Sequence, residues 1–225
     1  MSPTSCRQRQ KQIRAVLFDL DGTLIDHLPA IHRCYSYALP KVGIPAPSYE
    51  QVRRAIGGGL ENAMSNFVPP EKMPEALAHY RKHWDATMLD GANLMPGADE
   101  LLRHLVAQKI PCAVFTNKVG HSSREICRHL GIAQYFQFIL GAKDTHWLKP
   151  QIEFTRHALD ILKIPAAETA LVGDSPWDIQ AAKNAGMTSL VVTTGTHSAD
   201  ELAQHKPDAI YPDLPALHAA EFPTS

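Results

Sequence analysis

A short run of aliphatic residues, followed by turn residues and an amphipathic stretch, recurs along the chain. The aliphatic runs are AVLF at 15–18, IPCAVF at 110–115, ALVG at 170–173 and SLVVTT at 189–194. Such uninterrupted runs are typical of strands that are buried on both faces of a parallel sheet. The amphipathic stretches have the apolar spacing of helices and include residues 98–108, 121–131 and 152–163. Alternating strands and helices predict an α/β fold with a doubly wound parallel sheet.

The helix expected at 121–131 carries its own boundary signals. Ser122 and Glu125 have the spacing of a capping box, in which the two side chains bond to free amides of the first turn. Gly131 follows the last apolar position and is a typical helix stop. We therefore predict a helix that starts near Ser122 and ends at Gly131.

Residues 27 to 92 interrupt the alternation, because this segment shows helical patterns and no convincing strand. The patterns are IHRCYSYALPKVG, YEQVRRAI, ENAMSNF and PEALAHYRKHWDATML. Turn residues mark both boundaries of the segment. We therefore predict a flexible tail at 1–14, an α/β core at 15–26 and 93–225, and a helical insertion at 27–92. The tail is basic, which leaves a transit peptide open as an alternative.

Composition excludes several classes of function. The chain is 44% hydrophobic and 20% charged with a net charge of −1, which is typical of a soluble globular protein without a broad basic face for nucleic acid. No apolar stretch approaches the roughly 20 residues that cross a bilayer, and the first fourteen residues lack the hydrophobic centre of a secretory signal. We therefore expect a cytoplasmic protein with no membrane or nucleic-acid partner. The four cysteines lack CxxC spacing and are expected to be reduced thiols.

Polar and charged side chains follow several predicted strands, at the edge where an open α/β sheet binds its ligand. In chain order they are Asp19 and Asp21, Thr116 and Asn117, Lys149 in a turn before a helix, and Asp174 and Asp178. Carboxylates that converge on one crevice repel one another and lose hydration, so a cation must neutralise them. Oxygen ligands without histidine or thiolate favour Mg²⁺, which often bridges to a substrate phosphate. The lysine and the threonine hydroxyl suit phosphate oxygens, so we expect a phosphorylated substrate.

Two of these acids, Asp19 and Asp21, flank a single leucine at the end of the first strand. Cleavage of a phosphate ester gives such a pair two different tasks. One carboxylate can attack phosphorus to form an aspartyl phosphate. The other can protonate the leaving oxygen and then deprotonate the attacking water. Gly22 allows the chain to turn sharply just beyond them.

Four motifs stand in an order that resembles the haloacid dehalogenase-like hydrolases. They are DLDGTL at 19–24, TN at 116–117, Lys149, and GDSPWD at 173–178. The resemblance covers about residues 14–215, and the layout is similar to the phosphoglycolate phosphatase branch. It implies a Rossmann-like core and gives the insertion at 27–92 the role of a cap.

The resemblance implies a role for each catalytic candidate. Asp19 would be the nucleophile, and Asp21 would be the general acid and base. Thr116 and Asn117 would hold the phosphate group, while Lys149 would pair with the nucleophile and the phosphate.

The resemblance also implies a Mg²⁺ cofactor. Asp174 would bind the ion with the nucleophile, and Asp178 would support the site directly or through water. With the neighbouring acid included, the implied metal set is Asp19, Asp21, Asp174 and Asp178. The run SPWD at 175–178 leaves a structural alternative open, because it also has the cap residue, proline and acid of a helix N-terminus.

These inferences predict a phosphoric monoester hydrolase that acts on a small phosphorylated metabolite, either phosphoglycolate-like or a sugar phosphate, as a monomer or homodimer. A phosphomutase of the same superfamily and a catalytically idle binding scaffold remain as alternatives. Within the insertion, RRAIGGGLEN places three glycines between helical stretches. We expect Gly58 to allow close approach of a leaving group, and Arg53 or Arg54 to reach its carboxylate or hydroxyls. A flexible turn with solvated arginines is the alternative.

Overall fold

The computed structural model describes residues 13–223. Of the predicted tail at 1–14, only Ile13 and Arg14 fall within this range, and the rest lies outside the described residues. The Arg14 guanidinium pairs with the Glu168 carboxylate at 2.7 Å. Within the described range, no helix combines the length and the apolar character that crossing a membrane requires.

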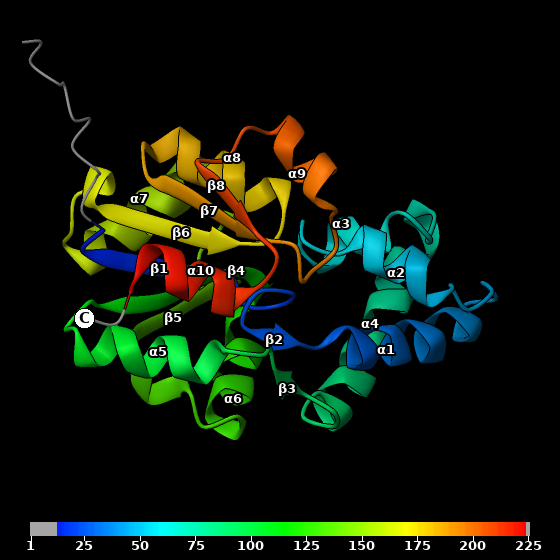
Figure 1. The fold of residues 1–225 in the computed structure, drawn as a ribbon. Helices are drawn as coiled ribbons and strands as arrows, with labels where there is room; N and C mark the ends of the chain where they lie inside the picture. The colour runs from blue at the N-terminus through cyan, green and yellow to red at the C-terminus, as the bar shows by residue number, and fades with distance from the viewer. Residues whose placement is uncertain (1–12, 224–225) are drawn as a thin grey trace, which may run out of the picture.

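The centre of the fold is a parallel sheet, which confirms the predicted α/β class (Figure 1). Its strands are β1 (Ala15–Phe18), β4 (Cys112–Val119), β5 (Phe136–Ala142), β6 (Thr169–Gly173), β7 (Thr188–Val192) and β8 (Ala209–Tyr211). They are arranged in the order β5-β4-β1-β6-β7-β8, and each neighbouring pair is parallel. Because β1 lies between β4 and β6, the strand order reverses there. A reversal of this kind forms a ligand crevice outside the carboxyl ends of the strands.

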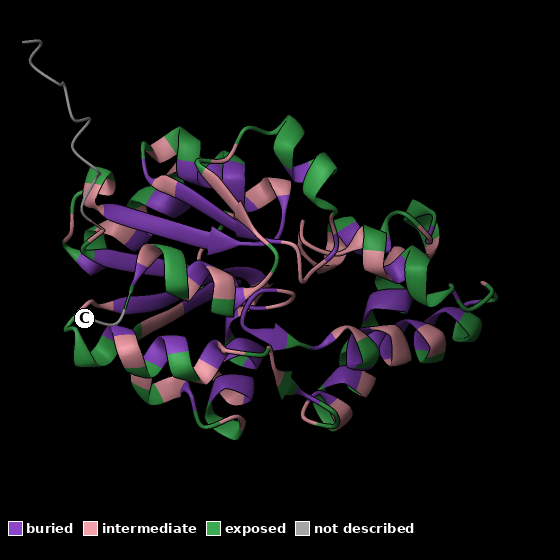
Figure 2. Ribbon diagram, in the orientation of Figure 1, coloured by how far each residue is buried: buried purple, intermediate pink, exposed green. Residues whose placement is uncertain are grey.

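Helices cover both faces of the sheet (Figure 1). They are α5 (Ala98–Ala107), α6 (Gly120–His129), α7 (Ile152–Leu162), α8 (Pro176–Ala185), α9 (Ala199–Gln204) and α10 (Leu214–Glu221). Alternate residues of β1 point to opposite faces. Val16 and Phe18 join the hydrophobic cluster that includes α5, α6 and α10, whereas Ala15 and Leu17 join the cluster that includes α7 and α8. Figure 2 shows the resulting buried strands between more exposed helices.

Residues 27–92, called the cap segment below, are largely helical, and the helices predicted there are present. They are α1 (Leu28–Lys41), α2 (Tyr49–Ala55), α3 (Leu60–Met64), a short 3-10 turn at Pro70–Lys72, and α4 (Met73–Thr87). The chain enters the segment through β2 (Ile25–Asp26) and leaves it through β3 (Asn93–Leu94), which pair as an antiparallel ribbon. Figure 1 shows these helices beyond the carboxyl ends of the sheet strands.

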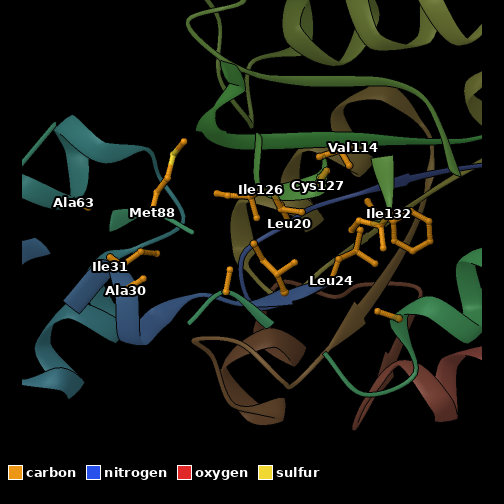
Figure 3. Packing of buried hydrophobic residues seen from close by; sticks show 14 of the residues in the cluster. Leu20, Leu24, Ala30, Ile31, Ala63, Met88, Val114, Ile126, Cys127 and Ile132 are labelled. Atoms are coloured by element: carbon orange, nitrogen blue, oxygen red, sulfur yellow. The ribbon is translucent and has the colours of Figure 1, made fainter. Parts of the chain in front are cut away.

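The hydrophobic interior continues from the sheet into the cap segment. One cluster of buried residues contains Ala30, Ile31, Ala63 and Met88 of the cap segment together with residues of the sheet and its helices (Figure 3). The labelled members outside the cap segment are Leu20, Leu24, Val114, Ile126, Cys127 and Ile132. This packing fixes the cap segment against the edge of the sheet at which the acids lie.

The predicted capping box at Ser122 is wrong. β4 continues to Val119 and α6 begins at Gly120, so Ser122 lies inside the helix. Its hydroxyl instead accepts a hydrogen bond from Nε1 of Trp84 in the cap segment, at 3.1 Å. The predicted helix end is confirmed, because Gly131 follows α6 with a left-handed φ of 68°.

Candidate active site

Three buried carboxylates meet at the carboxyl edge of the sheet. Asp19 follows β1, Asp174 follows β6, and Asp178 lies in the first turn of α8. One oxygen from each lies within 4.8 Å of the others. Burial raises the pKa of Asp19 from 3.8 to about 6, against the opposing charge of Lys149. Burial, and then the charge of Asp19, raises the pKa of Asp174 well above its ordinary value.

Lys149 supplies positive charge to this group. Its Nζ lies 3.0 Å from Oδ1 of Asp19 and 2.7 Å from Oδ1 of Asp178, and its side chain is 1% exposed. Burial lowers the pKa of Lys149, but the charges of Asp178 and Asp19 outweigh this effect and leave it raised. The ammonium is therefore a fixed charge between two of the three acids.

Asp174 is oriented by two donors and by two close glycines. The Thr23 hydroxyl donates to Oδ1 at 3.1 Å, and the Thr196 amide donates to Oδ2 at 3.2 Å. A Cβ atom at Gly22, whose φ is 82°, would lie 2.7 Å from Oδ2 of Asp174, and one at Gly195 would collide with the same carboxylate. Glycine is therefore required at the turn after the first motif, because the carboxylate fills the space of a side chain.

The three acids fit a hard divalent cation. The group consists of carboxylates alone, and oxygen ligands favour Mg²⁺ over softer metals. The buried Oδ1 of Asp19 has the Lys149 ammonium as a neighbour at 3.0 Å, yet burial still raises the pKa of this carboxyl to about 6. Asp178 is already occupied, since it binds Lys149 and accepts bonds from the amide and hydroxyl of Ser175 as part of a capping box. Asp19 and Asp174 are therefore the acids best placed to bind a metal directly, and Asp178 supports them.

Asp21 lies apart from this group, and its place in the metal set stays a prediction. Its two carboxylate oxygens accept hydrogen bonds from Nζ of Lys118 at 2.9 and 2.8 Å. The Lys118 ammonium also lies 4.5 Å from the ring centre of Trp84. Burial, and then the charge of Lys118, lowers the pKa of His27 to about 4, so this neighbour at 3.7 Å is neutral. Lys118 therefore holds Asp21 away from the acids around Asp19. The sequence analysis missed Lys118, whose signal was its position directly after the TN pair.

Thr116 and Asn117 both lie in β4 and are buried. The Thr116 hydroxyl hydrogen-bonds to Asp19 and works to lower that pKa. The carboxamide of Asn117 accepts from the Lys149 amide at 2.8 Å and donates to the carbonyls of Lys149 and Gly57, at 3.1 and 3.0 Å. Its side chain thus positions Lys149 and the cap segment, and its contact with a phosphate group stays a prediction.

A cavity of about 240 Å³ lies between the acids and the cap segment. Its wall on the sheet side includes Asp19, Asp21, Thr116, Lys118 and Asp174. Its wall on the cap side comes from α1, α3, α4 and the loop before α3. The cavity therefore reaches from the carboxylates into the cap segment.

Arg53 and Gly58 do not line this cavity, and their contact with the leaving group stays a prediction. The Arg53 guanidinium bonds to the Glu50 carboxylate and the Gly195 carbonyl, both at 2.9 Å. Arg54 also pairs with Glu50. A Cβ atom at Gly58 would lie 3.0 Å from the ring of Trp177, because this glycine packs against the start of α8. Both residues thus belong to the contact between the cap segment and the core.

Comparisons with known proteins show the family of this chain. A family model described as haloacid dehalogenase-like hydrolase matches residues 16–192. The chain is 34% identical over 201 residues to a probable phosphatase, IndB, of Dickeya dadantii, with 87% of each protein covered. It is 34% identical over 204 residues to a 5'-nucleotidase of Pseudomonas aeruginosa, covering 90% of this chain and 92% of the relative.

Phosphoglycolate phosphatases are also among the similar proteins. One from Yersinia pseudotuberculosis is 34% identical over 208 residues, with 89% of each protein covered. The crystal structure of a predicted phosphoglycolate phosphatase from Haemophilus somnus superimposes with a TM-score of 0.85 at 27% identity, covering 91% of this chain and 96% of that one. The chain therefore belongs to the haloacid dehalogenase-like hydrolase family, in the branch that resembles the phosphoglycolate phosphatases.

Proposed function

We propose that this protein is a Mg²⁺-dependent phosphatase that hydrolyses a small phosphomonoester through a phosphorylated Asp19. The observation that carries the proposal is the setting of that carboxylate. It is buried, and the Lys149 ammonium lies 3.0 Å from its Oδ1. The relatives named as phosphatases support the same reaction class.

The chain supplies a nucleophile and a separate acid for two successive displacements. First, an oxygen of Asp19 attacks phosphorus, the bond between phosphorus and the alcohol oxygen breaks, and Asp21 gives its proton to that oxygen. Then Asp21 takes a proton from water, the water oxygen attacks phosphorus, and the bond to Asp19 breaks to release phosphate. Lys149 offsets negative charge on the phosphoryl oxygens, and Lys118 orients Asp21.

Asp19 and Asp174 would hold Mg²⁺, with Asp178 supporting the site through Lys149 and Ser175. When bound, the ion neutralises charge that the phosphoryl oxygens bring into the crevice. The bonds from Thr23 and Thr196 keep the Asp174 carboxylate in position for this role.

We further propose that residues 27–92 act as a cap over a core formed by 15–26 and 93–225. The position of the cavity supports this division, because the cap segment provides one of its walls. So do the contacts across the boundary, from Asn117 to the Gly57 carbonyl and from Trp84 to Ser122. A closed cap excludes water from the phosphorylated aspartate during the first displacement.

The test separates the two acids of the first motif. Replacing Asp21 with asparagine removes proton transfer, a contribution of roughly 10² to 10⁴ in rate, while an aryl phosphate can still complete the first displacement. We expect the variant to give a burst of phenolate and a mass increase of about 80 Da, one phosphoryl group, on Asp19. Excess EDTA should abolish the burst, and added Mg²⁺ should restore it.

Asp19→Asn is the matched control, and it should show neither a burst nor a mass increase. Label on another residue would contradict the assignment of the nucleophile. Full activity of the wild-type enzyme in excess EDTA would contradict the metal dependence.

A further inference from the structure

The cap side of the cavity is largely apolar. Its apolar and aromatic residues are Ile31, Tyr35, Ile56, Leu60, Ala63, Tyr80 and Trp84, and the other cap-segment residues that line the cavity are Gly57, Gly59, Arg81 and Asp85. Tyr80 and Trp84 stack with an interplanar angle of 12°, and Tyr35 meets Tyr80 at a steep angle. An aromatic wall of this kind gains free energy by burying apolar surface of a ligand. It offers little to a leaving group that carries several polar groups or a charge.

The cations around the cavity are already paired. Among the described residues that line it, the lysines and arginines are Arg81, Lys118 and Lys143. Lys118 is held by Asp21. Arg81 and Lys143 both bind the same oxygen of Glu61, at 2.7 and 2.9 Å. Glu61 lies in α3 of the cap segment, and Arg81 and Lys143 share its single negative charge. Asp85 of α4 also lines the cavity, so the formal charges of these four side chains sum to zero.

A second charge on the substrate would therefore meet an unfavourable site. The phosphoryl group occupies the end near Asp19 and Lys149, which leaves the leaving group against the aromatic wall. A carboxylate there would lose hydration without gaining a free cation, and it would lie on the side occupied by Glu61 and Asp85. The site is thus built against leaving groups with a negative charge.

The hydroxyl of Tyr35 adds no charge to this wall. It is buried and has no hydrogen-bond partner among residues 13–223. Burial raises the pKa of Tyr35, so the hydroxyl stays protonated. It therefore cannot neutralise a carboxylate. The cavity of about 240 Å³ is also smaller than the ~300–1,000 Å³ typical of sites for drug-sized ligands.

We infer that the substrate is the phosphate monoester of a small, uncharged alcohol with an apolar or aromatic face, and that Glu61 contributes to this specificity through its ion pairs with Arg81 and Lys143. The inference rests on the proposed phosphatase activity and defines its substrate class. It also sets this chain apart from an enzyme for phosphoglycolate, whose leaving group carries a carboxylate next to the ester carbon.

The experiment compares matched esters that differ in charge. Isobutyl phosphate is the apolar counterpart of 2-phosphoglycolate in size and branching, and 4-isopropylbenzyl phosphate pairs in the same way with 4-carboxybenzyl phosphate. For each pair we expect kcat/KM of the wild-type enzyme with Mg²⁺ to favour the uncharged ester by at least about 10-fold. Equal rates, or a preference for the carboxylated ester, would overturn the substrate class.

Variants then test the role of the glutamate. Glu61→Gln frees Arg81 and Lys143, and we expect it to shift the ratio of kcat/KM toward the carboxylated ester by roughly 5-fold, the scale of an exposed ion pair. Glu71→Gln removes the same charge from an exposed position of the cap segment that does not line the cavity, so the ratio should stay at the wild-type value. An unchanged ratio in Glu61→Gln, or an equal shift in Glu71→Gln, would overturn the role of Glu61.

Failure of the inference can be told apart from failure of the proposed function. If the esters are hydrolysed in the presence of Mg²⁺ and the Asp19→Asn variant is inactive, the phosphatase stands whichever ester is preferred. If none of the four esters is hydrolysed faster by the wild-type enzyme than by Asp19→Asn, the proposed function falls, and the inference that rests on it falls too.

Discussion

Asparagine in place of Asp19 should make the metal-free protein more stable while abolishing activity. The wild-type carboxylate is 7% exposed, and burial raises its pKa from 3.8 to about 6 despite the nearby ammonium of Lys149. A pKa that is raised in the folded state stabilises the protein below about pH 4, and this contribution is lost as the pH rises through 6. At 1.36 kcal/mol for each tenfold change in the ionisation constant, the loss amounts to about 3 kcal/mol. The carboxamide of the variant would be neutral throughout and would avoid this loss.

Thermal and urea unfolding in EDTA would measure this difference. At pH 7.5 we expect the Asp19→Asn variant to be more stable than the wild type by up to about 3 kcal/mol, which is roughly 6–12 °C in Tm for a chain of this length. Near pH 4 the two proteins should unfold together. Addition of Mg²⁺ should narrow the gap at pH 7.5, because binding stabilises the protein that retains the carboxylate.

Asp160→Asn is the matched control, since this aspartate is exposed on α7 and away from the site. It should show no comparable gain between pH 4 and 7.5. If Asp19→Asn were equal to the wild type or less stable at pH 7.5 in EDTA, the carboxylate would already be compensated by Lys149. The electrostatic argument for a cation at this position would then fail.

Two further substitutions test buried polar groups. Tyr35→Phe removes a buried hydroxyl without a hydrogen-bond partner among the described residues, so we expect it to raise the free energy of unfolding by about 1 kcal/mol in the absence of substrate, as measured by urea unfolding. If Tyr35→Phe were instead less stable than the wild type, the Tyr35 hydroxyl would have a hydrogen-bond partner in the free protein. Thr23→Val removes the donor to Asp174 and should weaken Mg²⁺ binding about 10-fold, as measured by the Mg²⁺ concentration for half-maximal activity. Thr155→Val, a buried control in α7, should leave that concentration unchanged, and an equal effect of both variants would count against the role of Thr23.

The centre of the sheet was predictable from the sequence, and its edges were not. β1 has the predicted bounds of Ala15–Phe18, because every residue in it is buried and the apolar run is uninterrupted. β5 and β8 were missed, and they are the two outermost strands of the sheet. Each contains partly exposed positions, so neither shows the continuous apolar pattern of a strand buried on both faces. The predicted capping box at Ser122 was wrong because the hydroxyl makes a tertiary contact, in which it accepts a hydrogen bond from Trp84.

The candidate site divides in the same way. Asp19, Asp174 and Lys149 could be placed because strand ends and motif order bring them to one crevice. Lys118 could not be predicted as the partner of Asp21, because this contact depends on how β4 passes the loop after β1. The contact of Arg53 with the Gly195 carbonyl could not be predicted either, because the two residues are remote in the sequence. The residues that line the cavity on the cap side could not be predicted, because helical periodicity shows that a helix face is buried but not which partner covers it.

The β2–β3 ribbon has a consequence for how the chain assembles. It places Asp26 opposite Asn93, so the two ends of the cap segment meet in one short pairing. Without that pairing, β1 could reach β4 only by closing a loop through the whole intervening chain, at an entropic cost that rises with the logarithm of loop length. Once the ribbon forms, the loop that remains to be closed is a short one, whatever the length of chain beyond it. Inserts of different size between Asp26 and Asn93 therefore leave the register of the parallel sheet unchanged. The inserted segment can be exchanged without a change in the strands that position the acids.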